Sequence, residues 1–203
     1  MCNEYRRHVA LGEIVETFAQ LRIPLRFPEG APNLGPVDSI RITDRAAIVR
    51  AAGGEGEGEG AQLVQRRWSW PAPNGKPVYN LRSEGRGFTM GRCLIPADGF
   101  YEFTDPVPPP GELPQKRARK DKWLFTLPGA EWFCIAGMWR GSAQGEAFAM
   151  LTGAPGPDVA PYHGRQIVVL PRRDWSRWLD PAVPAQELLG PSPAGTFNVA
   201  QVL

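Results

Sequence analysis

The chain has few of the residues that bind metal ions, with three cysteines and two histidines among 203 residues. They show neither a CxxC nor an HxxxH spacing, so we expect no metal site. The cysteine count is odd, and Cys93 and Cys134 lie inside apolar runs, so a disulfide framework is not indicated either. These absences favour a reducing, cytoplasmic compartment.

Long apolar runs are also missing. No segment reaches the length of a membrane span, and the N-terminus lacks the hydrophobic region of a signal peptide. The Gly/Glu tract at residues 53–60 lacks the Lys-Ser/Thr pair of a phosphate-binding loop, and no G-x-S-x-G elbow is present. We therefore expect no membrane partner and no cofactor. A net charge of +2 permits contact with nucleic acid without arguing for it.

Glycine and proline, in contrast, are abundant. With 23 and 22 residues they exceed a fifth of the chain, which indicates many turns and short strands. The length suffices for a sizeable core, and no segment resembles a linker between two cores. The sequence therefore predicts one mostly-β domain of the α+β class over residues 1–203, with peripheral helices.

Hydrophobic periodicity places the elements along the chain. Helical spacing predicts helices over residues 11–21 and 174–179. Strands are expected within residues 40–49 (with a turn at 44–45), 78–81, 92–95, 100–103, 123–127, 132–139, 147–152, 166–170 and 196–203. Turn residues at 96–99 separate two of these strands. We expect a mobile loop at residues 53–60 and an inserted loop, rich in proline and then in basic residues, at residues 105–121.

Cys2 directly follows the initiator methionine. If Met1 is removed, Cys2 carries an α-amine and a thiol on adjacent carbons, and both are partly nucleophilic at neutral pH. The amine can form a Schiff base with an aldehyde, and the thiol can then close a thiazolidine ring. An internal cysteine lacks this chemistry because its nitrogen is part of an amide. Taken by itself, Cys2 is more simply explained as a residue that has no function.

Glu102 and His163 are candidates for proton transfer. Glu102 stands among Phe100, Tyr101 and Phe103, and a carboxyl group among aromatic rings can hold its proton near neutral pH. The alternative is that Glu102 points to solvent from one face of a strand. His163 lies on a loop before an apolar strand, a position suited to acid–base chemistry or to a purely structural loop histidine. The other histidine, His8, is expected at the surface.

Asn80, Arg82 and Glu84 alternate with other residues, so on a strand they would share one polar face. Such a face is either exposed to solvent or functional. The guanidinium group of Arg82 suits phosphate, and the amide of Asn80 could orient a substrate or an attacking group.

Four segments together resemble the SRAP family (SOS-response-associated peptidases). They are Met1-Cys2, the Asn-x-Arg-x-Glu stretch at 80–84, the run from Arg92 to Glu102 that contains Pro-Ala-Asp-Gly-Phe-Tyr-Glu, and His163-x-Arg165. Family members shield abasic sites in single-stranded DNA by covalent crosslinking. The resemblance implies a compact β-rich domain with a barrel-like curled sheet and peripheral helices.

The resemblance also implies roles for individual residues. Cys2 would be the nucleophile, Asn80 would hold the amino-terminal group, and Glu102 would assist proton transfer. His163 would help to open the sugar to its aldehyde. Arg82 and Arg165 would contact phosphates, and Trp68 and Trp70 would stack on bases, with core packing as the alternative for Trp68. The expected partner is single-stranded DNA with an abasic site, bound by a monomer that joins the nucleoid on damage.

The chain departs from the family pattern at several points. Many members begin Cys-Gly-Arg-Phe, whereas this chain has Cys2-Asn3-Glu4-Tyr5. Glu4 thus replaces an arginine, and Arg6 or Arg7 would have to substitute for it. The tryptophan-rich segment is shortened, and the C-terminal asparagine-rich signature is missing.

Two other functions stay open. One is a self-processing cysteine peptidase that removes Met1 with Cys2, His163 and Glu102 as nucleophile, base and helper. The other is a module that binds single-stranded DNA without a covalent product.

Overall fold

A computed structural model describes residues 2–52, 60–108, 110–111, 119–142 and 144–202. Most of the loop expected at 53–60 and part of the one expected at 105–121 lie outside these residues. The helices are α1 (Leu11–Gln20) and α2 (Trp175–Leu179), with short 3-10 helices at Arg172–Asp174 and Ala185–Glu187. The strands are β1 (Glu4–Arg7), β2 (Leu25–Arg26), β3 (Val37–Arg41), β4 (Arg45–Ala51), β5 (Ala61–Trp68), β6 (Trp70–Pro71), β7 (Pro77–Val78), β8 (Asn80–Arg82), β9 (Arg92–Ala97), β10 (Gly99–Thr104), β11 (Asp121–Thr126), β12 (Phe133–Ser142), β13 (Gly145–Gly153), β14 (Gln166–Ile167), β15 (Val169–Leu170) and β16 (Asn198–Gln201).

Five strands close into a barrel, which confirms the mostly-β α+β prediction. They pair in the order β13-β12-β9-β4-β5, and a parallel pairing between β5 and β13 closes the ring. The interior is narrow: a Cβ atom added to Gly137 would lie 2.7 Å from Cδ1 of Ile95 and 3.0 Å from Sγ of Cys93. A glycine is therefore needed at this point of β12.

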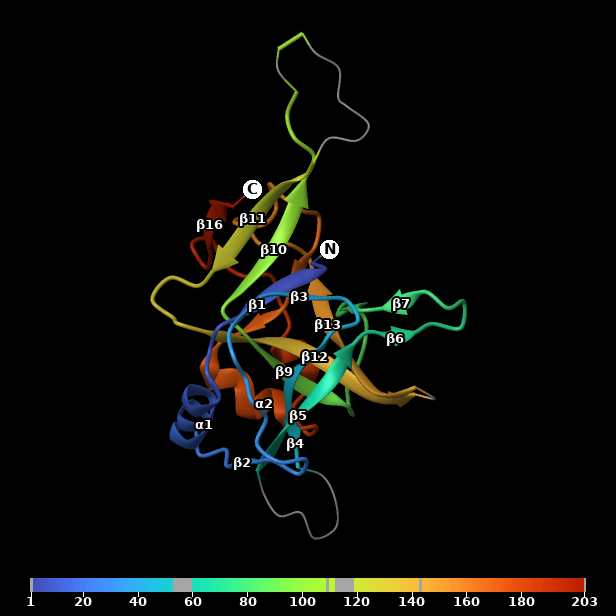
Figure 1. Cartoon of the computed structure of the whole chain (residues 1–203), viewed down its shortest axis with the longest axis vertical. Helices are drawn as coiled ribbons and strands as arrows, with labels where there is room; N and C mark the ends of the chain where they lie inside the picture. The colour runs from blue at the N-terminus through green and yellow to red at the C-terminus, as the bar shows by residue number, and fades with distance from the viewer. Residues whose placement is uncertain (1, 53–59, 109, 112–118, 143, 203) are drawn as a thin grey trace.

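Side chains that alternate along the barrel strands form two apolar clusters. The inner cluster includes Ile48, Ile95 and Phe148 and extends to Cys2 and Tyr5. The outer cluster lies under the two helices, and its members include Ile14 and Phe18 of α1, Trp175 and Trp178 of α2, and Val49, Leu63 and Leu94 of the barrel. Both helices predicted from their spacing are thus confirmed as outer layers of the barrel (Figure 1).

A second sheet, in the order β16-β11-β10-β1-β3, stands beside the barrel. Figure 1 shows β10 and β11 reaching beyond the barrel on the side where β16 lies. In this sheet Tyr5 of β1 is opposite Phe100 of β10, so the chain start runs along β10. This pairing brings the N-terminal segment to the strand that carries Glu102.

The turn predicted at residues 96–99 is wrong in its extent, because only a bend at Asp98 separates the two strands. Pro96 and Ala97 continue β9, and Asp98 alone separates it from β10. The Asp98 backbone N–H donates a 3.1 Å hydrogen bond to the carbonyl of Arg6, and its carboxylate pairs with the Arg6 guanidinium. At this bend the chain leaves the barrel and enters the second sheet.

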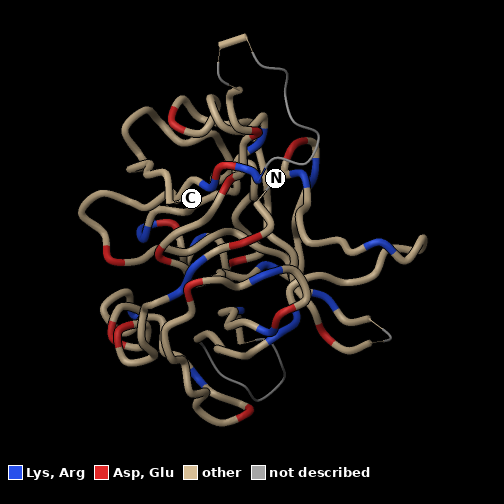
Figure 2. Tube along the Cα trace, turned by 45° about the horizontal axis from the view of Figure 1, so that its top comes forward, with Lys and Arg blue, Asp and Glu red and all other residues tan. Residues whose placement is uncertain are grey.

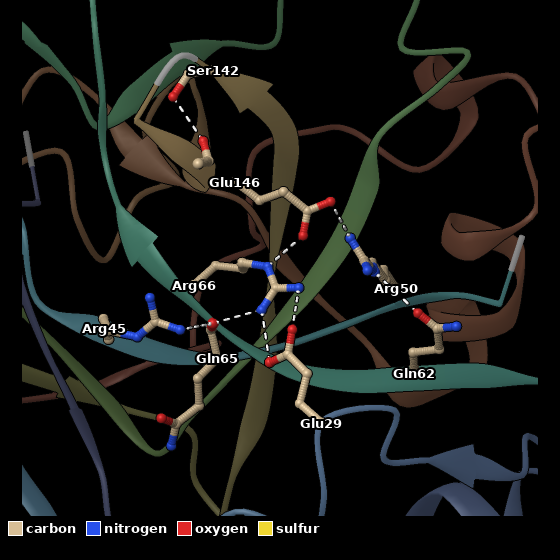
Figure 3. A network of polar contacts seen from close by, with 9 residues as sticks. Glu29, Arg45, Arg50, Gln62, Gln65, Arg66, Ser142 and Glu146 are labelled. Carbon is tan, nitrogen blue, oxygen red and sulfur yellow. Dashed lines mark hydrogen bonds and ion pairs between the residues drawn. The ribbon is translucent and has the colours of Figure 1, made fainter.

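An ionic network spans the closure of the barrel (Figure 3). The guanidinium of Arg66 on β5 lies 2.6 Å from Glu146 of β13 and 2.8 Å from Glu29. Glu146 also pairs with Arg50 of β4 at 3.0 Å. These contacts join three barrel strands next to the β5–β13 pairing and hold the segment around Glu29 against them.

Candidate functional site

Cys2 lies just before β1, and its side chain is buried, with 1% of its surface exposed. Its Sγ donates a 3.3 Å hydrogen bond to the carbonyl oxygen of Glu4. Burial raises the pKa of the Cys2 thiol, and the nearby carboxyl group of Glu102 raises it further. In the chain that still carries Met1, the Cys2 thiol is therefore protonated at neutral pH.

Asn80 contacts the same residue through its side chain. Its Nδ2 donates a 2.8 Å hydrogen bond to the carbonyl oxygen of Cys2. Asn80 starts β8, which pairs in parallel with β13, and Met150 is its register partner. Its Oδ1 atom is buried and accepts no hydrogen bond from any residue that the structure describes. The side chain is therefore held beside Cys2 with one acceptor unused.

Glu102 lies on β10 with 2% of its surface exposed, so the alternative that it points to solvent is wrong. Burial raises the pKa of the Glu102 carboxyl to about 7, although a hydrogen bond from the Cys2 backbone acts in the opposite direction. At neutral pH this carboxyl group can both accept and donate a proton. The group lies directly beside the backbone of Cys2.

His163 is half-buried in the segment between β13 and β14. Its Nδ1 accepts a 2.9 Å hydrogen bond from the backbone N–H of Arg165. Burial lowers the pKa of the His163 imidazole. The ring is therefore neutral at physiological pH. His8, as expected, is exposed.

The two expected phosphate ligands differ in their surroundings. Arg82 ends β8 and is exposed. Both terminal nitrogens of Arg165 instead lie 2.9 Å from the carboxylate oxygens of Glu84. Glu84 follows β8, so the expectation that it shares a strand face with Asn80 and Arg82 is wrong. A phosphate would have to displace this carboxylate before binding Arg165 in the same way.

The expected stacking tryptophans are both buried. Trp68 is 0% exposed, packs edge-on against Tyr5 at 5.3 Å between ring centroids, and donates from Nε1 to the carbonyl of Tyr79. Trp68 thus packs in the core, as the alternative expectation had it, and its ring is not exposed for base stacking in this structure. Trp70 is 5% exposed, and the guanidinium of Arg140 lies 4.4 Å from its ring centroid.

Position 4 is part of the fold's interior. The Glu4 carboxylate is buried and lies 2.6 Å from Nζ of Lys122, which in turn stands 3.8 Å from the ring centroid of Tyr101. Arg7 cannot replace the family's arginine at the surface, because it is buried and donates to the carbonyl oxygens of Val9 and Gly35. Arg6 likewise is paired with Asp98.

Sequence reasoning missed two aromatic residues at the site. Trp123 on β11 is the cross-strand partner of Glu102. Tyr162, the neighbour of His163, lies 4.7 Å from Trp123 between ring centroids. Both are half-buried. The β10–β11 register that places them here depends on long-range pairing, so no local pattern could have shown it.

Charges of both signs are spread over the part of the chain that the structure describes. Figure 2 shows basic and acidic residues scattered along a trace that is mostly uncharged. Within the described ranges, no group of histidine, cysteine, aspartate and glutamate side chains could hold a metal ion. Nor does this part of the chain contain a helix long and apolar enough to cross a membrane.

Three solved structures resemble this fold. A protein from Bordetella bronchiseptica is 21% identical over 100% of both chains, with a TM-score of 0.69. A protein from Bacteroides thetaiotaomicron is 14% identical over 100% of this chain and 92% of its own, with a TM-score of 0.70. A phage-related protein from Bordetella bronchiseptica is 20% identical over 99% and 94%, with a TM-score of 0.69.

No curated protein matches the chain. The family model "SOS response associated peptidase (SRAP)", however, matches residues 1–203, the whole sequence. The chain therefore belongs to the SRAP family.

Proposed function

We propose that this protein, once Met1 is removed, links covalently through Cys2 to abasic sites in single-stranded DNA and so shields them. The hydrogen bond from Asn80 to Cys2 carries the proposal, because it fixes the chain start beside a buried carboxyl group that titrates near neutral pH. An exposed arginine, Arg82, ends the strand that Asn80 begins and suits a phosphate next to the lesion.

The reaction begins at the sugar. Glu102 takes the proton of the C1 hydroxyl, the bond between C1 and the ring oxygen breaks, and the same carboxyl group returns the proton to that oxygen. This leaves an aldehyde at C1. A group that titrates at about pH 7 is suited to both transfers at neutral pH.

Two bonds then form at C1. The Cys2 amine adds to the aldehyde, and water leaves to give an imine. The thiol adds to the imine carbon, and its proton passes to the ring nitrogen. The net change is one bond from nitrogen and one from sulfur to C1, with loss of one water. The second step is intramolecular, so its effective molarity is very large.

The burial of Cys2 favours the amine as the first nucleophile. A thiol with a raised pKa is a poor source of thiolate. In a cysteine peptidase the thiolate attacks first, so the same burial disfavours that mechanism.

Self-processing of Met1 is the second candidate, supported by the family's description as a peptidase. Its test is the mass of protein produced while the host methionine aminopeptidase is inhibited. Loss of Met1 under inhibition supports self-cleavage, whereas retained Met1 assigns the removal to the aminopeptidase.

Covalent bonding is tested on a denaturing gel with single-stranded DNA that carries one abasic site. Cys2→Ala should form no stable adduct. The matched control is Cys134→Ala, which removes a buried internal thiol and should crosslink like the parent protein. Equal crosslinking by Cys2→Ala would refute the proposal. Salt-dependent binding without an adduct in the parent protein would leave the non-covalent DNA-binding module as the function.

A further inference from the structure

Arg165 is clamped between two neighbours. Its Nη1 and Nη2 atoms bind the two carboxylate oxygens of Glu84, each at 2.9 Å. Nη2 also donates to the Thr152 carbonyl at 2.6 Å, and Nε to the Thr152 hydroxyl at 3.3 Å. Thr152 lies on barrel strand β13 and is 1% exposed. A bidentate arginine–carboxylate pair is both strong and geometrically selective. The contacts of Arg165 with Glu84 and Thr152, which we call the clamp, tie Arg165 to the barrel.

The backbone of Arg165 contacts the ring of His163. The Arg165 N–H donates to Nδ1 at 2.9 Å, and the Arg165 carbonyl oxygen lies 3.1 Å from the same nitrogen. Nδ1 can accept from the N–H only while it carries no proton. A proton on Nδ1 would be directed to the carbonyl and would leave the half-buried N–H without its acceptor. The position of the Arg165 backbone therefore decides between the two ring tautomers.

Two further features favour a neutral His163 ring. The ring is half-buried, and the Arg165 guanidinium adds positive charge, and both oppose an imidazolium ion. A neutral imidazole that accepts at Nδ1 carries its proton on Nε2. In that state Nε2 is a hydrogen-bond donor.

We propose that Glu84 is a positioning residue which, through Arg165, holds His163 as the neutral tautomer with its proton on Nε2. His163 then donates a hydrogen bond to the sugar ring oxygen as it departs from C1, while Glu102 transfers the protons. This role rests on the proposed function. It gives Arg165 a structural task in place of the phosphate contact that the family resemblance implies.

The tautomer can be observed without any reaction. The chain has only two histidines, so long-range proton–nitrogen NMR spectra of ¹⁵N-labelled protein resolve each ring. His8→Gln assigns the signals, because His8 is exposed and pairs with exposed Asp38. We expect His163 to show one neutral tautomer, protonated on Nε2, at pH 7.5.

Glu84→Ala should disturb this state. We expect measurable population of the tautomer protonated on Nδ1 and about tenfold faster hydrogen exchange at the Arg165 amide, as the charge-assisted pair is lost. Glu84→Gln retains one possible hydrogen bond to Arg165, so its tautomer population and exchange rate should lie between those of the parent protein and of Glu84→Ala. Its backbone spectrum shows whether the variant is folded. An unchanged His163 ring and an unchanged Arg165 amide in both variants would overturn the proposal.

Crosslinking kinetics give the second readout. If Glu84 positions His163, Glu84→Ala lowers the maximal rate and leaves the half-saturating DNA concentration unchanged. If Arg165 is instead a phosphate ligand masked by Glu84, the variant binds DNA more tightly with the same maximal rate, and the proposal is wrong. Arg82→Ala is the comparison variant. Loss of an exposed phosphate contact should weaken DNA binding and reduce by about 1 the slope of the logarithm of the binding constant against the logarithm of the salt concentration.

The two proposals fail in different ways. A parent protein that forms no adduct, but whose His163 tautomer still depends on Glu84, refutes the crosslinking function and leaves standing only the effect of Glu84 on the tautomer. A protein that crosslinks equally well with and without Glu84, at every DNA concentration, supports the function and overturns the role of Glu84.

Discussion

Asn80 Nδ2 donates a 2.8 Å hydrogen bond to the carbonyl oxygen of Cys2, although 78 positions separate the two residues in the sequence. The bond connects the start of β8, which pairs with barrel strand β13, to the segment that leads into β1 of the second sheet. It holds the chain start beside Glu102, the group to which the proposed function assigns proton transfer.

Removal of this bond should slow the reaction. We expect Asn80→Ala to lower the crosslinking rate about 10²-fold, because a small displacement of a reacting group costs rate on that scale. The measurement is single-turnover crosslinking at saturating DNA. Asn74→Ala, which changes an exposed asparagine in the turn between β6 and β7, should react at the parental rate. Equal rates for the two variants would show that Asn80 does not position Cys2.

Glu102 should make stability depend on pH. Its pKa in the folded state, about 7, is raised above the ordinary value of 4.5. The folded protein therefore holds this proton more tightly than the unfolded chain, and stability that is present below about pH 4.5 is lost as the pH rises through 7. The loss amounts to roughly 3 kcal/mol in the free energy of unfolding.

Glu102→Gln should lack this contribution. Denaturant unfolding of parent and variant at pH 5 and pH 8 isolates it, since the other titrating groups are common to both. The variant should gain stability relative to the parent at pH 8. Glu16→Gln, on the exposed face of α1, should not. A pH-independent difference between Glu102→Gln and the parent would contradict the raised pKa.

The Glu4–Lys122 pair should behave as a buried ion pair. The side chains of Glu4 and Lys122 are 7% and 18% exposed. Lys122→Met leaves the carboxylate without its principal partner, and we expect a loss of about 3 kcal/mol in the free energy of unfolding. Adding Glu4→Gln removes the uncompensated charge and should restore most of that loss. Urea unfolding of both single variants and the double variant tests this, and strictly additive effects would argue against the pair.

Arg66 should be important for the barrel closure. Arg66→Ala leaves Glu29 and Glu146 facing each other without the cation between them. We expect a loss of about 1 to 2 kcal/mol in the free energy of unfolding, because the Arg66 side chain is 9% exposed, whereas Glu29 is 52% exposed and Glu146 keeps its pairing with Arg50. Arg67→Ala, which removes the exposed arginine next in sequence, should change stability by less than about 0.5 kcal/mol. Thermal unfolding of the two variants provides the comparison.

Local patterns predicted much of the fold. The spacing of Ile14 and Phe18 predicted α1, and alternation predicted most strands, because both signals arise from neighbouring residues. The closure of the barrel could not be predicted in this way. Ala147 pairs with Arg67, 80 positions earlier, and nothing in either segment specifies a parallel partner.

The site was predicted in part. Asn80 and Glu102 do lie beside Cys2, whereas Trp68 lies in the core. Ser69, between the two tryptophans, has a φ of 107°, a left-handed backbone conformation that breaks the strand. β5 ends at Trp68 and β6 begins at Trp70, and both rings are buried, which the aromatic composition of this segment alone cannot show.

The most direct test of the account is the intact mass of the product formed with single-stranded DNA that carries one abasic site. We predict a mass equal to the protein without Met1 plus the DNA minus one water, in a band that survives denaturation. A protein whose N-terminus is confirmed as Cys2, and which yields no such product, would contradict the central claim.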